Sequence, residues 1–461
     1  MQSFLKKTTS SLLVIKGRRR IGKSRLIAEF GKGMKALIFT GLPPEDGKTT
    51  AQVQRDFFAK QMELLIGIKG LKGDDWTDLF WHLAKAAKRG RLLIVFDEIN
   101  WMGSLDGTFL GKLKSAWDLY FKSNPKLIMI LSGSMSTWIE TNILNSTGFM
   151  GRISYDLTLE ELPLPTCNDF WREQIDAISP YEKFKVLSVT GGVPRYLEEI
   201  NPHLAAEEII YRLAFRKGAL LVKEFDRIFN DLFSRRSHRY KEIVKCLAEG
   251  SADLSEIAQA IDMELGGTIS DYLDDLVETG YVARDYTWNI KNGTESKLSK
   301  FRLKDNYIRF YLKYIEPKLH RIEKNQLKVV PAWTSIMGLQ FENLVLNNIH
   351  RLVQLLNIDS NEIVYDSPYF QRPTKEHRGC QIDYMIQTQF NTLYVFEIKS
   401  SKDKIGTQII SELKDKITAL AKPKNISYRP ILIHVNGVTD TLIEANYFSH
   451  IIDFSQFLES N

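Results

Sequence analysis

A glycine-rich segment near the start of the chain has the residue types and spacing of a phosphate-binding loop. Gly17 and Gly22 enclose four residues, and Lys23 and Ser24 follow at once. Glycines let the backbone curl so that its N–H groups face phosphate oxygens, a lysine adds positive charge, and a serine hydroxyl can reach Mg²⁺. We predict that this segment binds ATP and Mg²⁺, with Lys23 also acting in catalysis. Its residues are Gly17, Arg18, Arg19, Arg20, Ile21, Gly22, Lys23, Ser24 and Arg25.

Two acidic residues end a second apolar segment, RLLIVFDEIN. Asp97 and Glu98 follow five apolar residues, which predicts the carboxyl end of a buried strand. A carboxylate in such a place can hold Mg²⁺, and a second one can accept the proton of an attacking water. We predict that Asp97 is the metal partner and Glu98 the catalytic base. The alternative is a strand that simply meets a polar loop.

A third apolar run, KLIMILSGS, ends in Ser132 and Ser134. If this run is the next strand of the sheet, one of the two hydroxyls lies beside the γ-phosphate and senses hydrolysis. All three motifs follow strand ends, and nucleotide sites in open parallel sheets lie at the carboxyl ends of the strands. The predicted fold class is therefore α/β, with the parallel sheet of a P-loop NTPase.

The composition is that of a folded protein with several domains. The chain has 461 residues, of which 44% are hydrophobic and 26% charged, so it exceeds one hydrophobic core and has no sign of disorder. Its longest aliphatic runs are far shorter than the roughly 20 residues of a membrane-spanning helix, and the N-terminus lacks the apolar segment of a secretory signal. The three cysteines include no C-x-x-C pair. We predict a cytoplasmic protein with no membrane partner.

Residues 11 to 230 resemble the archaeal-type ATPase family, a branch of the signal-transducing P-loop ATPases related to the AAA+ class. The resemblance rests on the order and spacing of GRRRIGKS, VFDEINWM, LSGSMSTWI, GRISYDLTLEELPL and TGGVPRYLEEI. It implies a helical lid that contains Gly192 and Pro194, with the proline against adenine. Arg152 would be the basic residue downstream of the third strand, either as an arginine finger on the γ-phosphate or in a salt bridge at a domain interface.

The middle of the chain reads as a winged helix beside a basic belt. From Arg239 the pattern predicts three short helices and a hairpin that turns at Asn292-Gly293. The third helix has four acidic residues and no Lys or Arg, so we expect it to repel DNA phosphate. Between Arg212 and Cys246, ten Lys or Arg stand against four Asp or Glu, which predicts DNA contact or, alternatively, a solvated helix face. The residues expected to contact phosphate are Arg235, Arg236 and Arg239 of the belt and Arg284, Lys291, Lys297, Lys300 and Arg302 of the wing.

The last third of the chain carries a second set of charged residues. LQFENLVLNNIHRL predicts a helix with Glu342, GCQIDYMIQT a strand with Asp383, and LYVFEIKS its hairpin partner with Glu397 and Lys399. Glu397 and Lys399 point to the same face of a strand, and a short turn can bring Asp383 alongside. Two carboxylates beside an ammonium group suit a hard divalent cation and a phosphate.

This order of residues resembles the PD-(D/E)xK superfamily of restriction-endonuclease-like domains. The resemblance implies that Asp383 and Glu397 bind Mg²⁺, and that Lys399 positions the water or stabilises charge on the phosphorane. Glu342 would assist from its helix as a further metal ligand. Ile382 replaces the proline that is usual before the first acid. The alternative is a retained fold that only binds a partner.

Together these patterns predict Mg²⁺-dependent ATP binding and hydrolysis, coupled to a DNA-associated winged helix and a metal-dependent nuclease domain. The alternative is a regulatory ATPase switch that binds protein partners or a second copy of itself, with a catalytically silent nuclease-like domain. The acidic third helix favours the switch, whereas the charged set of the last third favours the nuclease. The predicted parts are a P-loop ATPase core (1–165), a helical lid (166–235), a winged helix (236–305), a helical linker (306–331) and a restriction-endonuclease-like α/β domain (332–461).

Overall fold

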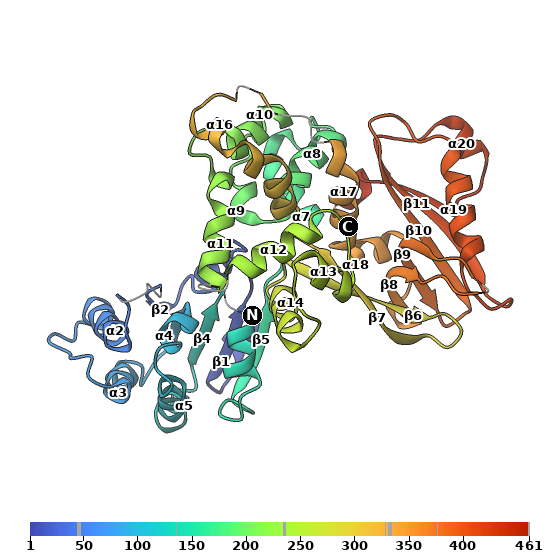
Figure 1. Cartoon of the computed structure of the whole chain (residues 1–461). Coiled ribbons are helices and arrows are strands. Elements are labelled where there is room, and N and C mark those ends of the chain that lie inside the picture. The colour runs from blue at the N-terminus through green and yellow to red at the C-terminus, as the bar shows by residue number, and fades with distance from the viewer. Residues whose placement is uncertain are drawn as a thin grey trace. The chain divides into compact units, whose positions relative to one another are not determined.

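The structure is a computed structural model that describes residues 1–43, 48–134, 136–233, 237–327, 329–330, 334–375 and 377–459. The chain divides into two units, Met1–Glu160 and Glu161–Asn461 (Figure 1). In the described part of the chain, no helix has both the length and the apolar composition needed to cross a membrane.

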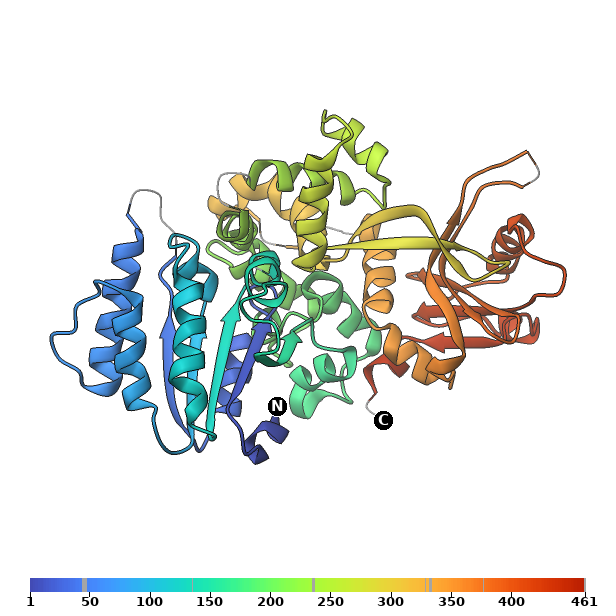
Figure 2. The ribbon, with the colours of Figure 1, turned by 90° about the horizontal axis from the view of Figure 1, so that it is seen from below.

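The first unit contains a five-stranded parallel sheet in the order β2-β3-β4-β1-β5. Strands β1 and β4 are buried along their whole length, as expected of apolar strands that helices cover on both faces (Figure 2). The predicted parallel α/β sheet is confirmed. Its strands are β1 (Ser11–Lys16), β2 (Lys35–Thr40), β3 (Leu92–Asp97), β4 (Leu127–Gly133) and β5 (Ile153–Thr158).

Successive residues of β1 face two separate cores. Leu12 and Val14 pack with residues of α2, α3 and α5, whereas Leu13 and Ile15 pack with Ile27 of α1. This alternation is that of a strand with side chains on both faces of a sheet. The helices of this unit are α1 (Lys23–Phe30), α2 (Ala51–Ile66), α3 (Trp76–Ala86), α4 (Ile99–Gly103), α5 (Phe109–Leu119) and α6 (Ser136–Ile139).

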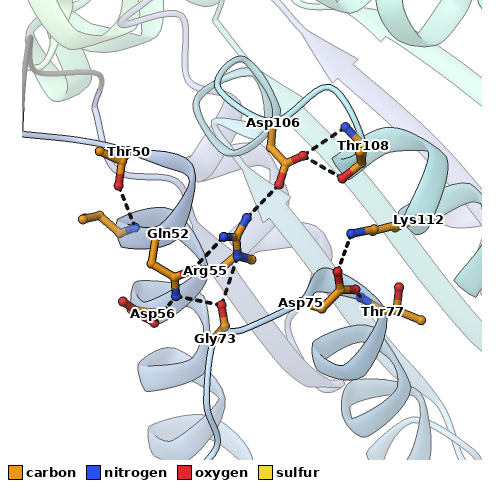
Figure 3. Close-up of polar contacts among 11 residues, drawn as sticks. Thr50, Gln52, Arg55, Asp56, Gly73, Asp75, Thr77, Asp106, Thr108 and Lys112 are labelled. Carbon is orange, nitrogen blue, oxygen red and sulfur yellow. Dashed lines mark hydrogen bonds and ion pairs between the residues drawn. The ribbon is translucent and has the colours of Figure 1, made fainter.

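Polar side chains tie α2 to the loops that precede α3 and α5 (Figure 3). Arg55 of α2 donates from Nε to the carbonyl oxygen of Gly73 at 3.0 Å and from Nη1 to Asp106 Oδ2 at 2.9 Å. Gln52 donates to the same Gly73 carbonyl at 2.9 Å. Arg55 therefore holds together three segments of the helical layer, one of them the loop that follows α4.

We expect Arg55→Ala to lower the free energy of unfolding by about 1–3 kcal/mol, because Asp106 and the Gly73 carbonyl would lose a donor in a largely buried position. Denaturant titration of the full chain measures this change. Arg89→Ala removes an exposed arginine and should alter the same quantity by less than about 0.5 kcal/mol. Equal effects of the two substitutions would contradict the role given to Arg55.

The largest hydrophobic cluster described in the second unit extends from Leu164 to Leu458. The regions predicted as lid, winged helix, linker and nuclease-like domain therefore share a core, and the boundaries between them stay predictions. The first helices of this unit are α7 (Leu164–Asn168), α8 (Pro180–Thr190), α9 (Pro194–Leu197), α10 (Ala206–Ile210) and α11 (Glu224–Phe233).

Three helices and a hairpin follow in the order that the sequence predicts from Arg239. Helix α13 begins with a capping box, in which Asp253 and Glu256 each accept a hydrogen bond from the backbone N–H of the other. Gly293, in the turn of the hairpin, has a φ of 69°. The name winged helix for this arrangement stays a prediction. The elements are α12 (Ser237–Leu247), α13 (Leu254–Ala260), α14 (Gly267–Glu278), β6 (Val282–Asn289) and β7 (Thr294–Leu303).

The hairpin packs against the C-terminal sheet. Trp288 Nε1 donates to Gln387 Oε1 at 2.6 Å, and Gln387 Nε2 donates to the carbonyl oxygen of Ile290 at 2.9 Å. Arg302 is only 9% exposed and donates from Nε to Asp285 Oδ2 at 3.0 Å. The prediction that Arg302 is available for phosphate is wrong, because the opposite strand supplies its partner.

The basic belt is neutralised at several positions by ion pairs. Surface ion pairs of this kind contribute little to the stability of the fold. Each of them, however, neutralises one positive charge of the belt that was predicted to contact DNA. Arg235 and Arg236 lie outside the described residues. The pairs are Arg212–Glu208, Arg239–Glu242, Lys241–Asp226 and Lys245–Glu316.

The C-terminal sheet is mixed, in the order β12-β11-β10-β9-β8. Strands β8, β9 and β10 are antiparallel neighbours, whereas β10, β11 and β12 run parallel. The predicted hairpin between the strands of Asp383 and Glu397 is confirmed as β9–β10. Residues Ile409, Leu413 and Ile417 of α19 pack on this sheet. The strands are β8 (Ile363–Gln371), β9 (Cys380–Thr388), β10 (Thr392–Ser400), β11 (Ser427–Val435) and β12 (His450–Asp453), and the remaining helices are α15 (Asn306–Phe310), α16 (Leu319–Glu323), α17 (Met337–Leu346), α18 (Ile349–Leu355), α19 (Gln408–Ala419), α20 (Asp440–Glu444) and α21 (Ser455–Leu458).

Buried hydrogen bonds fix helix α17, which carries Glu342. Gln340 Nε2 donates to the carbonyl oxygens of Ser188 at 2.6 Å and Asn306 at 2.8 Å. Its Oε1 accepts from Nη1 of Arg309 at 2.8 Å, and Arg309 is 1% exposed. Because buried polar groups are costly to leave unpaired, α17 keeps one position relative to α8 and α15.

Candidate functional site

The predicted phosphate-binding loop joins β1 to α1 and uses backbone conformations that favour glycine. The φ angle is 148° at Gly17 and 95° at Gly22. A Cβ at Gly17 would lie 2.5 Å from the carbonyl oxygen of Leu159, so this position has no room for a side chain. The loop therefore follows a tight path into the N-terminus of a helix, where backbone N–H groups attract phosphate.

Lys23 lies inside this loop. Its Nζ donates to the carbonyl oxygens of Gly17 at 2.7 Å and Arg18 at 3.2 Å, and the residue is 7% exposed. Burial lowers the pKa of Lys23 from its ordinary value, while Glu98 and Asp97 act in the opposite direction. The ammonium group thus lies among the backbone atoms of the loop and close to the acidic end of β3.

Ser24 and Asp97 come together from α1 and β3. Ser24 Oγ donates to Asp97 Oδ2 at 3.2 Å. A hydroxyl and a carboxylate in contact are oxygen ligands of the kind that Mg²⁺ accepts, so the two residues fit the ion predicted for them. Of the other loop residues, Arg18 and Ile21 are buried, Arg19 and Arg20 are partly exposed, and Arg25 is exposed.

Glu98 and Ser134 are in contact at the ends of the neighbouring strands β3 and β4. Glu98 Oε2 accepts from Ser134 Oγ at 2.8 Å and from its backbone N at 3.2 Å. Glu98 also has a φ of 50°, a conformation unusual for a residue with a side chain. Ser134 follows β4, which lies between β1 and β3. Of the two serines predicted as a sensor, Ser132 is fully buried within β4, so Ser134 is the one in contact with the predicted base.

Arg152 is paired with Asp118 of α5 in the same unit. Its Nε donates to Asp118 Oδ1 at 3.0 Å and its Nη2 to Oδ2 at 2.8 Å. These hydrogen bonds lower the pKa of Asp118 to about 2. A bidentate pair of this kind holds the guanidinium plane in a fixed direction, so Arg152 is in a salt bridge within the first unit.

We expect Arg152→Ala to change the rate of ATP hydrolysis by less than about three-fold, because the guanidinium is already committed to Asp118. An arginine that contacts the γ-phosphate contributes about a thousand-fold or more. Steady-state phosphate release by the wild-type chain and by the Arg152→Ala variant distinguishes a salt-bridge role from contact with the γ-phosphate. A loss of the larger size would assign Arg152 to the γ-phosphate.

The lid residues predicted from the resemblance lie in the second unit. A Cβ at Gly192 would lie 2.3 Å from the carbonyl oxygen of Leu162, and the Gly192 N–H donates to Glu161 Oε2 at 2.9 Å. Pro194 is the first residue of α9, where its missing N–H has no cost. The contact predicted between Pro194 and adenine stays a prediction.

The second candidate site lies on the β9–β10 hairpin. The backbone N–H of Ile398 donates to Asp383 Oδ2 at 2.8 Å, which brings Asp383 alongside the strand of Glu397. Glu397 is 1% exposed. Its Oε1 accepts from Lys399 Nζ at 3.2 Å, so the pair shares one face as the strand period predicts. Lys399 also donates to Glu412 at 3.2 Å.

Lys416 of α19 completes this site, and we did not predict it from the sequence. Its Nζ lies 2.6 Å from Glu397 Oε2 and 3.6 Å from Asp383 Oδ1. Two carboxylates from neighbouring strands thus converge on one cationic atom. The available signal was weak, because Lys416 only flanks the apolar stripe of Leu413 and Ile417 on an otherwise charged helix.

Glu342 is the third predicted acid of this site. Burial raises the pKa of Glu342 to about 7, and Asp383 adds to this rise. Burial, together with Glu397, raises the pKa of Asp383 to about 6. Among the described residues, no three His, Cys, Asp or Glu side chains gather closely enough to hold a metal ion. Asp383 and Glu397 fit a divalent cation as a pair, because one ammonium group already contacts both.

Comparison with known proteins relates the N-terminal part of the chain to ATPase domains. Residues 1–200 match the model of a family described as an ATPase domain predominantly from Archaea. Over 416 residues the chain is 24% identical to an uncharacterized protein of Methanocaldococcus jannaschii, and the match covers 88% of each chain. A solved Walker-type ATPase of Pyrococcus abyssi aligns with 66% of this chain and 91% of its own, at 18% identity and a TM-score of 0.46. The ORC2 protein of Aeropyrum pernix, solved as ADPNP-ADP complexes, aligns with 70% of this chain and 90% of its own, at 13% identity and a TM-score of 0.38.

The parallel sheet and the glycine loop at its strand ends define the first unit as a P-loop NTPase core. The match of residues 1–200 to an ATPase domain described as predominantly from Archaea agrees with this assignment. The rest of the chain lies outside that match.

Proposed function

We propose that the chain binds and hydrolyses ATP with Mg²⁺ at the loop Gly17 to Ser24. This proposal rests on three features that lie together at the carboxyl ends of adjacent strands. They are Lys23 inside the loop, the Ser24–Asp97 contact and the Glu98–Ser134 contact. Nucleotides bind at such strand ends in open parallel sheets.

Each group has a role that its position supports. The loop N–H groups and Lys23 bind the β- and γ-phosphates, and Ser24 with Asp97 would hold the Mg²⁺ ion, which neutralises phosphate charge. Glu98 accepts the proton of the attacking water. Ser134 orients the Glu98 carboxylate through the hydrogen bond from its hydroxyl.

We expect Glu98→Gln to retain ATP binding within about two-fold and to lower the rate of hydrolysis by about a hundred-fold or more, because an amide cannot accept the proton. Calorimetric titration with ATP and a phosphate-release assay measure the two quantities. Glu63→Gln, on α2 and away from the loop, is the matched control and should leave both unchanged. Normal turnover of the Glu98 variant would remove Glu98 from the role of base.

We further propose that the C-terminal sheet cuts nucleic acid with a divalent metal, as the resemblance to PD-(D/E)xK nucleases implies. Asp383 and Glu397 are the metal ligands, and Lys399 stabilises negative charge on the phosphate. The supporting observation is the convergence of both carboxylates on Lys416 Nζ. A bound divalent ion would supply charge neutralisation at the scissile phosphate and a more acidic water.

Exposed cations near this site suit the backbone of DNA. The loop before β9 and the loop after β10 leave the sheet at the same edge, because these strands are antiparallel. That edge is also where Asp383 and Lys399 lie. Positive charge around a cleavage site binds phosphate without regard to base sequence. The exposed residues are Lys375 and Arg378 in the first loop and Lys402 and Lys404 in the second.

The other candidate function is an ATPase switch with a silent nuclease-like domain. The acids of α14 favour it, because Asp271 and Asp274 are exposed there and would repel phosphate. In that case the C-terminal domain and the hairpin would bind a protein partner or a second copy of the chain. The cleavage assay described in the Discussion distinguishes the two functions.

A further inference from the structure

The candidate metal site already contains a cation that the chain itself supplies. Among the residues that the structure describes, only Lys416 has an ammonium group in contact with both acids, with Nζ at 2.6 Å from Glu397 Oε2 and 3.6 Å from Asp383 Oδ1. The lysine of the sequence motif, Lys399, contacts Glu397 and Glu412 instead. Lys416 is thus placed where a divalent cation shared by the two acids would lie.

Charge balance explains why a cation is needed there. Glu397 is 1% exposed, and a carboxylate at that depth is costly unless a positive group is in contact with it. Asp383 is 19% exposed in its side chain and accepts only one backbone hydrogen bond among the contacts described, from Ile398. A divalent cation could satisfy the same oxygens, but it would have to displace the ammonium group, since both cannot occupy one position.

The ammonium group of Lys416 can move away from Asp383 and Glu397 without unfolding the site. Its side chain is 29% exposed, so the ammonium group can reach water by rotation of a flexible stem. Glu412, one helical turn earlier on α19, is 49% exposed and offers a carboxylate at the i−4 position. Glu397 would keep Lys399 as a partner when Lys416 moves away.

We propose that Lys416 is a built-in competitor of the metal ion: it neutralises Asp383 and Glu397 when no metal is bound, and a divalent cation binds by displacing it. Lys416 is a positioning residue that sets how tightly the site holds metal. This inference rests on the proposed role of Asp383 and Glu397 as metal ligands, and it adds the group that controls their occupancy.

Binding of Mn²⁺ to the nucleotide-free full-length chain, followed by electron paramagnetic resonance, tests this proposal. The signal that Asp383→Asn abolishes belongs to the C-terminal site. We expect Lys416→Gln to tighten that binding by roughly ten-fold or more, because an ion pair at this distance no longer has to be broken. Lys416→Arg keeps the positive charge and should give no tightening. Thermal unfolding of each variant verifies that it is folded.

A second measurement uses the wild-type chain. Amine-reactive labelling read by mass spectrometry should modify Lys416 faster with Mn²⁺ than without it, while the exposed Lys414 on the same helix reacts at one rate in both. If an Asp383-dependent Mn²⁺ site exists but neither its affinity responds to Lys416→Gln nor the labelling to Mn²⁺, competition by Lys416 is wrong and the metal site stands. If no protein shows an Asp383-dependent site, the proposed nuclease function fails and this inference fails with it.

Discussion

Lys23→Ala should weaken ATP binding by about a hundred-fold and reduce hydrolysis to background. The side chain lies inside the phosphate-binding loop, where it is 7% exposed and contacts the Gly17 and Arg18 carbonyl oxygens. A buried ammonium group that contacts phosphate contributes about 2–5 kcal/mol to binding. Calorimetry with Mg²⁺ and ATP measures the affinity, and phosphate release measures the rate.

Lys32→Ala is the matched control for this substitution. Lys32 is an exposed lysine just beyond α1, and it pairs with Glu29 at 2.5 Å. We expect ATP affinity and hydrolysis within two-fold of wild type for this variant. Unchanged affinity in the Lys23 variant would mean that the loop is not the phosphate site.

Asp383→Ala should abolish metal-dependent cleavage of nucleic acid, a loss of about a thousand-fold or more, because a metal ion contributes several kcal/mol to this reaction. ATP hydrolysis should remain at the wild-type rate, since the P-loop lies in the other unit. Single-stranded, duplex and branched DNA, each with Mg²⁺ or Mn²⁺ and ATP, are the substrates to test. Ca²⁺ should permit binding with little cutting, because the larger ion holds a looser geometry.

Asp415→Ala removes an exposed carboxylate of α19 and is the control, with cleavage expected at the wild-type rate. If wild-type protein leaves every DNA uncut under all these conditions, the nuclease role is wrong. The ATPase switch that binds protein partners then becomes the function that the chain supports best.

The nucleotide site could be predicted from sequence because its chemistry is local. Gly17, Lys23 and Ser24 belong to one short segment, and the apolar runs before Asp97 and Ser134 mark buried strands by length and composition. The sequence places Ser134 at a strand end beside the γ-phosphate, and its hydrogen bond to Glu98 is seen only in the structure. The hairpin that joins the strands of Asp383 and Glu397 followed from two apolar runs and a short turn.

Contacts between side chains that are far apart in the sequence could not be predicted. Arg302 stands in a strand rich in Lys and Arg, and nothing local indicates that Asp285 and Asn343 enclose it. Lys416 lies 19 residues from Glu397 on a helix that also carries Lys414, so which lysine reaches the acids depends on how α19 packs against the sheet. The sequence does not distinguish the two roles of Arg152 for the same reason, because its partner Asp118 is on a helix 34 residues earlier.

The central claim is that Gly17 to Ser24 cradles the phosphates of ATP, and a crystal structure of the chain with Mg²⁺ and a non-hydrolysable ATP analogue tests it most directly. The account predicts that Lys23 Nζ moves from the carbonyl oxygens of Gly17 and Arg18 to the phosphate oxygens. It also predicts a Mg²⁺ ion beside Ser24 and Asp97, with Glu98 facing the γ-phosphate. Nucleotide bound elsewhere, with Lys23 still hydrogen-bonded to its own loop, would contradict it.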